Sequence, residues 1–267
     1  MDWLNAIILG AVQGITEFLP ISSDGHLVLA SALLGVNATL DMTVLLHLGS
    51  LAAIAIVFRR DVRALVFPRI DWHGLMVLAI ASIPAVIVGL TLKILLPKAT
   101  GTEVERSVMQ SPLWAAGGLI FTAAMLWTAE IKREPSVTLA NVRGGGYLGV
   151  LLIGCMQALA ILPGVSRSGS TISTALALKW LRPEAVRLSF MMGLIAITGA
   201  GLLEAKEIAK IEPVTGICGF VSSFVFSLFG LWAVRLVVLK GKLRWFAAYC
   251  LVLGVGALVY LLVVKRS

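Results

Sequence analysis

Leu19-Pro20-Ile21-Ser22-Ser23-Asp24-Gly25-His26 interrupts an apolar segment at residues 4–36, and Leu162-Pro163-Gly164-Val165-Ser166-Arg167-Ser168-Gly169-Ser170-Thr171 interrupts a second one at 147–181. After each break roughly a dozen residues remain, too few to cross a hydrocarbon layer of about 30 Å as a helix. A broken helix survives at membrane depth only where protein or a water-filled cavity satisfies its freed backbone groups. We therefore expect both segments to be re-entrant helical hairpins that meet inside a bundle of membrane-spanning helices.

The composition places these segments in a membrane protein. Of the 267 residues, 59% are hydrophobic and 13% are charged, whereas soluble domains average about 45–50% and about 25%. These values exclude a soluble single domain and a disordered chain. Six further apolar runs have the length of membrane-spanning helices, and they lie at 40–58, 75–96, 112–129, 187–204, 214–239 and 245–264. The predicted fold class is an all-α polytopic membrane protein.

The two halves of the chain share one plan, a re-entrant helical hairpin followed by three transmembrane helices. The first half covers about residues 1–130 and the second covers about 147–267. Because three is an odd number of spans, the second half enters the membrane from the opposite side, which predicts an inverted-topology repeat with its binding site near the midplane. A shift of 144 residues pairs four identical residues: Gly10 with Gly154, Gln13 with Gln157, Ser22 with Ser166 and Gly25 with Gly169.

The positive charges predict how the chain is oriented. Its net charge is +8 without a basic tail or stripe, so we expect this excess to anchor the chain among membrane lipids and not to bind nucleic acid. The connections at 59–74, 130–146, 182–187 and 240–244 would share one face and hold 12 Lys or Arg, against 6 on the other face. We therefore expect the first face to be cytoplasmic and both termini to lie outside the cytoplasm.

The ionisable or reactive candidates of the first break are Glu17, Ser22, Ser23, Asp24 and His26, and Gln13 lies one helical turn before Glu17. Gln13 and Glu17 share a helix face, and Ser23 and His26 can share another if the helix restarts there. A carboxylate within the membrane costs at least about 2.5–3.5 kcal/mol, so Glu17 needs a cation, a proton or an arginine. A salt bridge that only stabilises the fold is the alternative to a functional Glu17.

The second break combines hydroxyl groups, glycines and a guanidinium in a turn that leads into a short helix. Backbone N–H groups at a helix start favour negative charge, and arginine offers a planar fork of donors that matches phosphate. We therefore predict an anion site whose polar side chains are Ser166, Arg167, Ser168 and Thr171. The alternative is that the hydroxyl groups cap the helix and that Arg167 only pairs with Glu17.

His47 is a further polar residue, inside the span predicted at 40–58. A histidine at this depth can form a hydrogen bond to a neighbouring helix. We expect His47 to be a satisfied structural side chain and not a catalytic one.

The run from Gln13 to His26, followed by the run from Pro163 to Thr171, resembles the bacterial undecaprenyl-diphosphatase family associated with bacitracin resistance. Both signatures match in order, and the resemblance covers essentially the whole chain. Gln13 departs from the family pattern, in which many members carry a second glutamate. The resemblance implies hydrolysis of the terminal phosphate of a polyprenyl diphosphate lipid in the bacterial inner membrane. The product is the monophosphate lipid carrier that cell-wall synthesis uses.

Phosphoryl transfer suggests a role for each candidate residue. In our hypothesis Arg167 and several hydroxyl groups hold the phosphoryl oxygens, and these hydroxyl groups belong to Ser22, Ser166, Ser168 and Thr171. Ser23 is the preferred nucleophile, and His26 serves as its base or as the acid for the leaving phosphate. Glu17 orients His26, or it holds a divalent cation, Mg²⁺ or Ca²⁺, with help from Gln13. These roles can be exchanged, because His26 could itself be the phosphorylated nucleophile.

The sequence leaves another function class open. An inverted repeat with paired broken helices is also the plan of transporters, so the alternative function is a transporter or flippase for an anionic lipid or solute. The grouping of serine, histidine and arginine weighs against this alternative. A homodimer is a further possibility.

Overall fold

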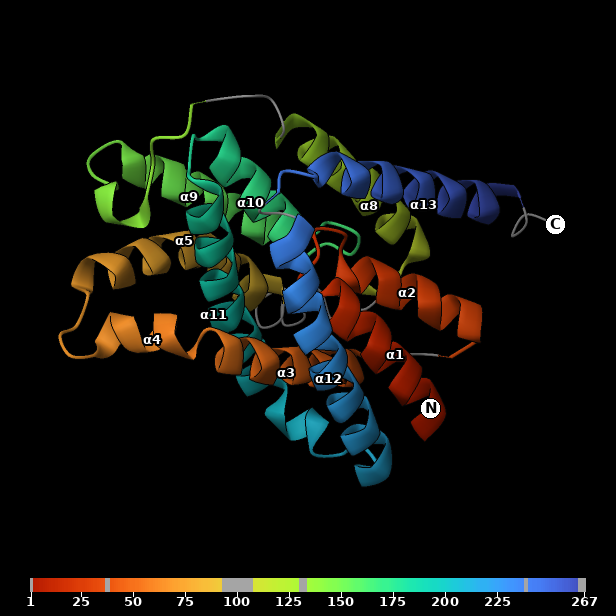
Figure 1. The fold of residues 1–267 in the computed structure, drawn as a ribbon. Helices are drawn as coiled ribbons and strands as arrows, with labels where there is room; N and C mark the ends of the chain where they lie inside the picture. Colours follow the sequence, from red (N-terminus) through yellow and green to blue (C-terminus); the bar gives the residue numbers. More distant parts are fainter. Residues whose placement is uncertain (1, 37–38, 93–107, 130–133, 238–239, 264–267) are drawn as a thin grey trace.

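The structure, a computed structural model, describes residues 2–36, 39–92, 108–129, 134–237 and 240–263, and this part of the chain is mostly helical (Figure 1). The helices in chain order are α1 (Trp3–Thr16), α2 (Ser23–Leu34), α3 (Leu40–Val57), α4 (Arg59–Val66), α5 (Trp72–Leu90), α8 (Pro112–Ala129), the 3-10 helix η2 (Leu139–Asn141), α9 (Gly146–Leu159), α10 (Arg167–Ala177), α11 (Arg182–Ile208), α12 (Pro213–Val237) and α13 (Leu243–Val263).

Six of the described helices, α3, α5, α8, α11, α12 and α13, are long and apolar enough to cross a membrane. They lie where the sequence predicts the six spans, with ends that differ by a few residues. The last residues predicted for the spans at 75–96, 214–239 and 245–264 lie outside the described residues. The prediction of an all-α polytopic membrane protein is therefore confirmed.

Two predicted connections contain helix. The connection at 59–74 holds α4, whose Leu65 packs into the core beside a set of exposed arginines. The connection at 182–187 is the first part of α11, because Pro183 needs no hydrogen-bond acceptor in a first helical turn and Glu184 is favourable near a helix N-terminus. Asp61 of α4 and Arg187 of α11 form an ion pair of 2.8 Å between these two segments.

The first hairpin consists of α1, a turn and α2. Pro20 has no N–H to continue α1, and Ser22 takes a φ of 67°, a conformation that side chains other than glycine rarely adopt. The Ser22 hydroxyl accepts the N–H of Gly25 at 3.3 Å, and the Ser22 carbonyl accepts the N–H of His26 at 3.2 Å. These two bonds start α2 and fix the direction of Ser23.

The second hairpin, α9 and α10, also turns at a capping serine. Ser166 is the N-cap of α10, and its hydroxyl accepts the N–H of Gly169 at 3.0 Å. Gly164 has a φ of 87° and lies against the backbone of Ala115 in α8, where no side chain would fit. Thr122 of α8 donates to the Gly164 carbonyl at 2.8 Å and accepts the N–H of Ser166 at 2.9 Å.

Small residues let each hairpin pack closely on a helix from the other half of the chain. The helix α1 lies along α12, and a Cβ atom at Gly10 would come within 2.6 Å of the Gly219 carbonyl oxygen. In the same way α9 lies along α5, with Gly154 against the backbone of Ala81. These contacts tie each hairpin to the other half of the chain.

The turns of the two hairpins meet inside the bundle. A Cβ atom at Gly25 would lie 2.8 Å from the Cα atom of Gly164, and the Ser168 hydroxyl donates to the carbonyl of Leu19 at 3.1 Å. Both turns are well inside the protein, since Phe18 is fully buried and Ser166 is buried. The predicted convergence of the two hairpins is therefore confirmed.

Candidate active site

A cavity of about 700 Å³ opens where the two hairpins meet α3, α5 and α11. Its volume is within the range of small-molecule sites. The polar residues of its wall include Glu17, Ser22, Ser23, Asp24, His47, Ser166 and Arg167. Much of the remaining wall is apolar and includes Leu27, Val28, Val44, Val86, Leu90, Ile195 and Leu203. The cavity therefore offers a charged end for a polar group and an apolar surface for a hydrocarbon chain.

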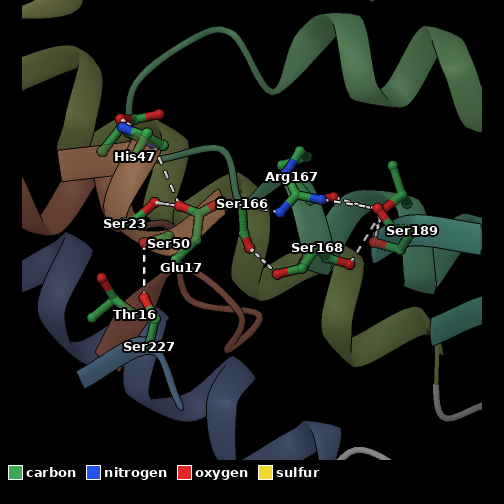
Figure 2. Close-up of polar contacts among 12 residues, drawn as sticks. Thr16, Glu17, Ser23, His47, Ser50, Ser166, Arg167, Ser168, Ser189 and Ser227 are labelled. Atoms are coloured by element: carbon green, nitrogen blue, oxygen red, sulfur yellow. Dashed lines mark hydrogen bonds and ion pairs between the residues drawn. The ribbon is translucent and has the colours of Figure 1, made fainter. Parts of the chain in front are cut away.

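Glu17 is the centre of the polar contacts (Figure 2). It follows the last turn of α1 and is buried. Arg167 donates from Nη2 to Oε1 of Glu17 at 3.0 Å. The other carboxylate oxygen, Oε2, accepts the Ser23 hydroxyl at 2.6 Å and Nε2 of Gln13 at 2.8 Å. Glu17 thus has the arginine partner that its depth in the membrane requires.

Arg167 begins α10 and reaches across to the first hairpin. Besides Glu17, its guanidinium binds the carbonyl of Ser189 in α11 through Nη1 at 2.9 Å. Gly193, one turn further along α11, leaves the space in which the guanidinium lies. A guanidinium has five N–H donors, so donors remain on the cavity side for an anion. Ser166 lies on the same wall, at the N-terminus of α10, which favours negative charge.

Ser23 combines a hydroxyl group with an adjacent base. Its Oγ–H points at Glu17, an ionised acceptor at 2.6 Å, which is the length of a strong hydrogen bond to a carboxylate. A serine becomes a nucleophile when a neighbouring base can take its proton. The structure therefore places Glu17 beside the Ser23 hydroxyl, where the sequence suggested His26.

His26 lies differently from the prediction. Its Nδ1 is 2.6 Å from the Ser22 carbonyl, and its Nε2 is 2.8 Å from the hydroxyl of Tyr249 in α13. A carbonyl only accepts, so Nδ1 carries the proton and Nε2 accepts from Tyr249. His26 is not among the described residues that line the cavity. The His26 ring supports the strained turn through its contact with the Ser22 carbonyl. Its hydrogen bonds do not include Ser23, Glu17 or Arg167.

Ser168 and Thr171 also face protein and not the cavity. The Ser168 hydroxyl donates to Leu19, and the Thr171 hydroxyl bonds Ser189 at 2.7 Å and the Arg167 carbonyl at 2.7 Å. Neither residue is among the described residues on the cavity wall. Of the hydroxyl groups predicted to bind phosphate, the structure places Ser22 and Ser166 on the wall, whereas Ser168 and Thr171 hold α10 in place.

His47 and Asp24 complete the polar end of the cavity. Asp24 was a candidate of the first break without an assigned role, and His47 was expected to be structural. Nε2 of His47 lies 3.4 Å from Oε2 of Glu17 and 3.5 Å from Oδ1 of Asp24. The signal that could have found His47 is its depth alone, because an ionisable side chain inside a membrane span is functional by default.

Serine side chains fix the position of α3 and therefore of His47. Ser227 of α12 donates to Ser50 of α3 at 2.8 Å, and Ser223 donates to the Leu46 carbonyl at 2.6 Å. Since α12 also packs on α1, the helix that leads to Glu17, these bonds hold His47 and Glu17 in register. Figure 2 shows the hydrogen bond between Ser50 and Ser227.

The contacts of Gln13 and Glu17 do not fit the Mg²⁺ or Ca²⁺ site predicted for this pair. Gln13 presents its Nε2–H₂ donor to Glu17, and its Oε1 is buried without a hydrogen-bond partner in the described part of the chain. Both Glu17 oxygens already accept from other side chains. Within the described residues, no group of three or more His, Cys, Asp or Glu side chains is arranged to hold a metal ion.

The fold and the site together define a polytopic membrane protein with a buried ion pair, Glu17–Arg167, where two broken helices meet. Residues 6–256 match the family described as Bacitracin resistance protein BacA, so the chain belongs to this family. The resemblance that the two signatures carry is therefore confirmed.

Relatives that match along nearly their whole length are named undecaprenyl-diphosphatase. The one from Methanosphaera stadtmanae is 33% identical, with 96% of each chain aligned. The one from Alcanivorax borkumensis is 36% identical over 98% of this chain and 100% of its own. The one from Rhodopirellula baltica is 36% identical over 95% of this chain and 96% of its own.

Proposed function

We propose that this protein hydrolyses undecaprenyl diphosphate to undecaprenyl phosphate and inorganic phosphate, which recycles the lipid carrier for cell-wall synthesis. Family membership supports this activity. The observation that carries it on this chain is the contact of Ser23 and Arg167 with the two oxygens of one buried carboxylate, Glu17. In this proposal Ser23 is the nucleophile, Glu17 is its base and Arg167 is the cation that binds phosphate, and all three line one cavity.

In the reaction that we propose, the diphosphate enters the charged end of the cavity and the prenyl chain lies against the apolar wall. Arg167 and Ser166 bind the oxygens of the terminal phosphoryl group, where charge must be stabilised. Ser23 Oγ attacks the terminal phosphorus, its proton passes to Oε2 of Glu17, and the bond to the bridging oxygen breaks to release undecaprenyl phosphate. Water then attacks the phosphoserine, the bond from phosphorus to Ser23 Oγ breaks, and Glu17 returns its proton to Oγ. Inorganic phosphate leaves with the oxygen and protons of the water, which restores both Ser23 and the Glu17 carboxylate.

His26, Ser168 and Thr171 act indirectly in this proposal. His26 supports the turn that presents Ser22 and Ser23, and the two hydroxyl groups hold the helix that presents Arg167. A divalent cation, Mg²⁺ or Ca²⁺, held by Glu17 and Gln13 was the alternative role for Glu17, and it stays a prediction. Because the Gln13 and Glu17 contacts do not fit a metal site, no step above depends on a metal ion.

We also propose that the two halves form an inverted-topology repeat. Three observations support it: Ser22 and Ser166 cap equivalent helices, Gly10 and Gly154 pack on helices of the other half, and Gly25 lies against the second turn. In Figure 1 the N-terminal end of α1 and the C-terminal end of α13 point toward one edge of the view, and the arginine-rich α4 lies at the opposite edge. This arrangement supports a bacterial inner-membrane orientation with α4 cytoplasmic and both termini outside. A homodimer stays a prediction.

The test is release of inorganic phosphate from undecaprenyl diphosphate by the purified protein in detergent. We expect release by the wild type, and its loss in Ser23→Ala and in Arg167→Lys, because a lysine cannot reproduce the fork that binds both Glu17 and phosphate. Transport of the intact diphosphate lipid across vesicles without phosphate release would favour the transporter or flippase alternative and contradict the proposal.

A further inference from the structure

His47 lies at the polar end of the cavity, and its two ring nitrogens have different surroundings. Nδ1 is 2.8 Å from the carbonyl oxygen of Thr43, which can only accept, so Nδ1 carries a proton. Nε2 points between two carboxylates, at 3.4 Å from Glu17 and 3.5 Å from Asp24. Without a proton, Nε2 would present its lone pair to two acceptors, so one further proton belongs among these three side chains.

The charges of the site lead to the same conclusion. Glu17 and Asp24 bring two negative charges into the membrane, and Arg167 supplies one positive charge. A proton on Nε2 makes His47 the second cation, and the four groups then sum to zero, which avoids the cost of an uncompensated charge in the membrane. Glu204 of α11 is the remaining charged residue among the described ones on this wall, and it is engaged in an interaction of its own.

We propose that His47 is a positioning residue for the phosphatase reaction: its Nε2 proton, shared with Glu17 and Asp24, holds the Glu17 carboxylate toward Ser23. The proposal rests on the proposed function and adds a residue to it. The shared proton offsets the second carboxylate, so that Glu17 stays ionised beside Ser23 and the anionic diphosphate can enter. Loss of the proton at high pH leaves two carboxylates facing each other beside the substrate site, and activity falls.

The test is the pH dependence of kcat/KM for phosphate release from undecaprenyl diphosphate. We expect the wild type to lose activity on the alkaline side as the shared proton leaves. His47→Gln keeps an N–H donor near Glu17 but carries no titratable proton, so it should lose this alkaline limb and lower kcat/KM about 10- to 100-fold at neutral pH, as a misplaced positioning group does. The same substrate is used throughout, so its own ionisation is common to all the profiles.

A second variant keeps the proposal testable if His47→Gln does not fold. Asp24→Asn removes a negative charge beside the proton, the proton is then held less strongly, and the alkaline limb should move to lower pH. The control is His73→Gln, because His73 bonds the Val142 carbonyl away from the cavity, and its profile should match the wild type. A wild-type alkaline limb in both His47→Gln and Asp24→Asn would overturn the proposal. If the wild type released no phosphate at all, the proposed function would fail first.

Discussion

Glu17 and Arg167 lie 150 positions apart in the chain and form an ion pair of 3.0 Å, one from the turn after α1 and the other from the first residue of α10. Each residue belongs to a different hairpin, so the pair exists only because the two hairpins meet. Removal of either partner leaves an uncompensated charge inside the protein, which costs more than the pair itself contributes. The pair therefore links the stability of the hairpin junction to the chemistry at Ser23.

Glu17→Gln is expected to lower kcat for phosphate release by at least about 10²-fold, the smaller end of what a general base contributes. The amide cannot accept the Ser23 proton, and Arg167 loses its anionic partner. The matched control is Glu207→Gln, because Glu207 is exposed and pairs with Lys210 outside the cavity. The assay is phosphate release by folded protein. Wild-type turnover by the Glu17→Gln variant would exclude Glu17 as the base that takes the Ser23 proton.

Gly193→Ala tests whether the guanidinium of Arg167 needs the space that Gly193 leaves on α11. A Cβ atom at Gly193 would come within 2.5 Å of Cζ of Arg167, whose position is already fixed by Glu17 and Ser189. We expect the guanidinium to shift and kcat to fall by roughly 10²-fold, the cost of a displacement of about 1 Å at a reacting centre. Gly256→Ala on α13 is the control, because its Cβ atom would meet nothing within 4 Å. Equal kcat values for the two variants would contradict the role given to Arg167.

Gly117 and Gly118 of α8 test how closely the turn of the second hairpin packs on this helix. Alanine at either position has the same effect on the helix itself, but only alanine at Gly118 would meet the turn. A Cβ atom at Gly118 would collide with the backbone from Pro163 to Val165, whereas one at Gly117 would meet nothing within 4 Å. We expect Gly118→Ala to lower the free energy of unfolding by about 1–3 kcal/mol, as overpacking does. Gly117→Ala should raise it slightly, because alanine is the better helix former. Thermal unfolding in detergent gives the midpoint temperature of each variant. Equal midpoints would mean that the turn of the second hairpin does not pack against Gly118 of α8.

Tyr249→Phe tests whether His26 acts through the turn that it supports. The change removes the donor to Nε2 of His26 and one hydrogen bond of about 0.5–1.5 kcal/mol. We expect a modest fall in kcat, and a smaller additional effect of Tyr249→Phe once His26→Ala is present, because the two residues act as one unit. Tyr260→Phe, on the exposed part of the same helix, is the control. Strictly additive effects of the two substitutions on kcat would mean that Tyr249 and His26 act independently, which would contradict the prediction.

Much of the fold could be predicted because the membrane permits few structures. A polar break in an apolar segment must be buried in protein, so the two breaks had to meet, and Glu17 had to find a cation. The ion pair with Arg167 follows from these two constraints. The helix α4 was missed because a charged stretch between two spans reads equally well as a loop, and only its Leu65 reaches the core.

The partners of the two histidines could not be predicted from local pattern. The helix α3 is apolar on almost every face, so its periodicity does not say that His47 turns toward Glu17. Ser23 and His26 are three residues apart, which suggested a shared face, but the nearest acceptor for the His26 ring is the Ser22 carbonyl and its other partner, Tyr249, is 223 residues away. Such contacts depend on how the helices are rotated in the bundle.

The most direct test of the account is to find which residue carries phosphate during turnover. The wild-type protein is mixed with undecaprenyl diphosphate labelled in its terminal phosphate, quenched within the first turnover, digested and mapped by mass spectrometry under conditions that preserve both phosphoserine and phosphohistidine. We predict labelled phosphate on Ser23, the hydroxyl that donates to Glu17 at 2.6 Å. Labelled phosphate on His26, whose ring lies against Ser22 and Tyr249, would contradict it.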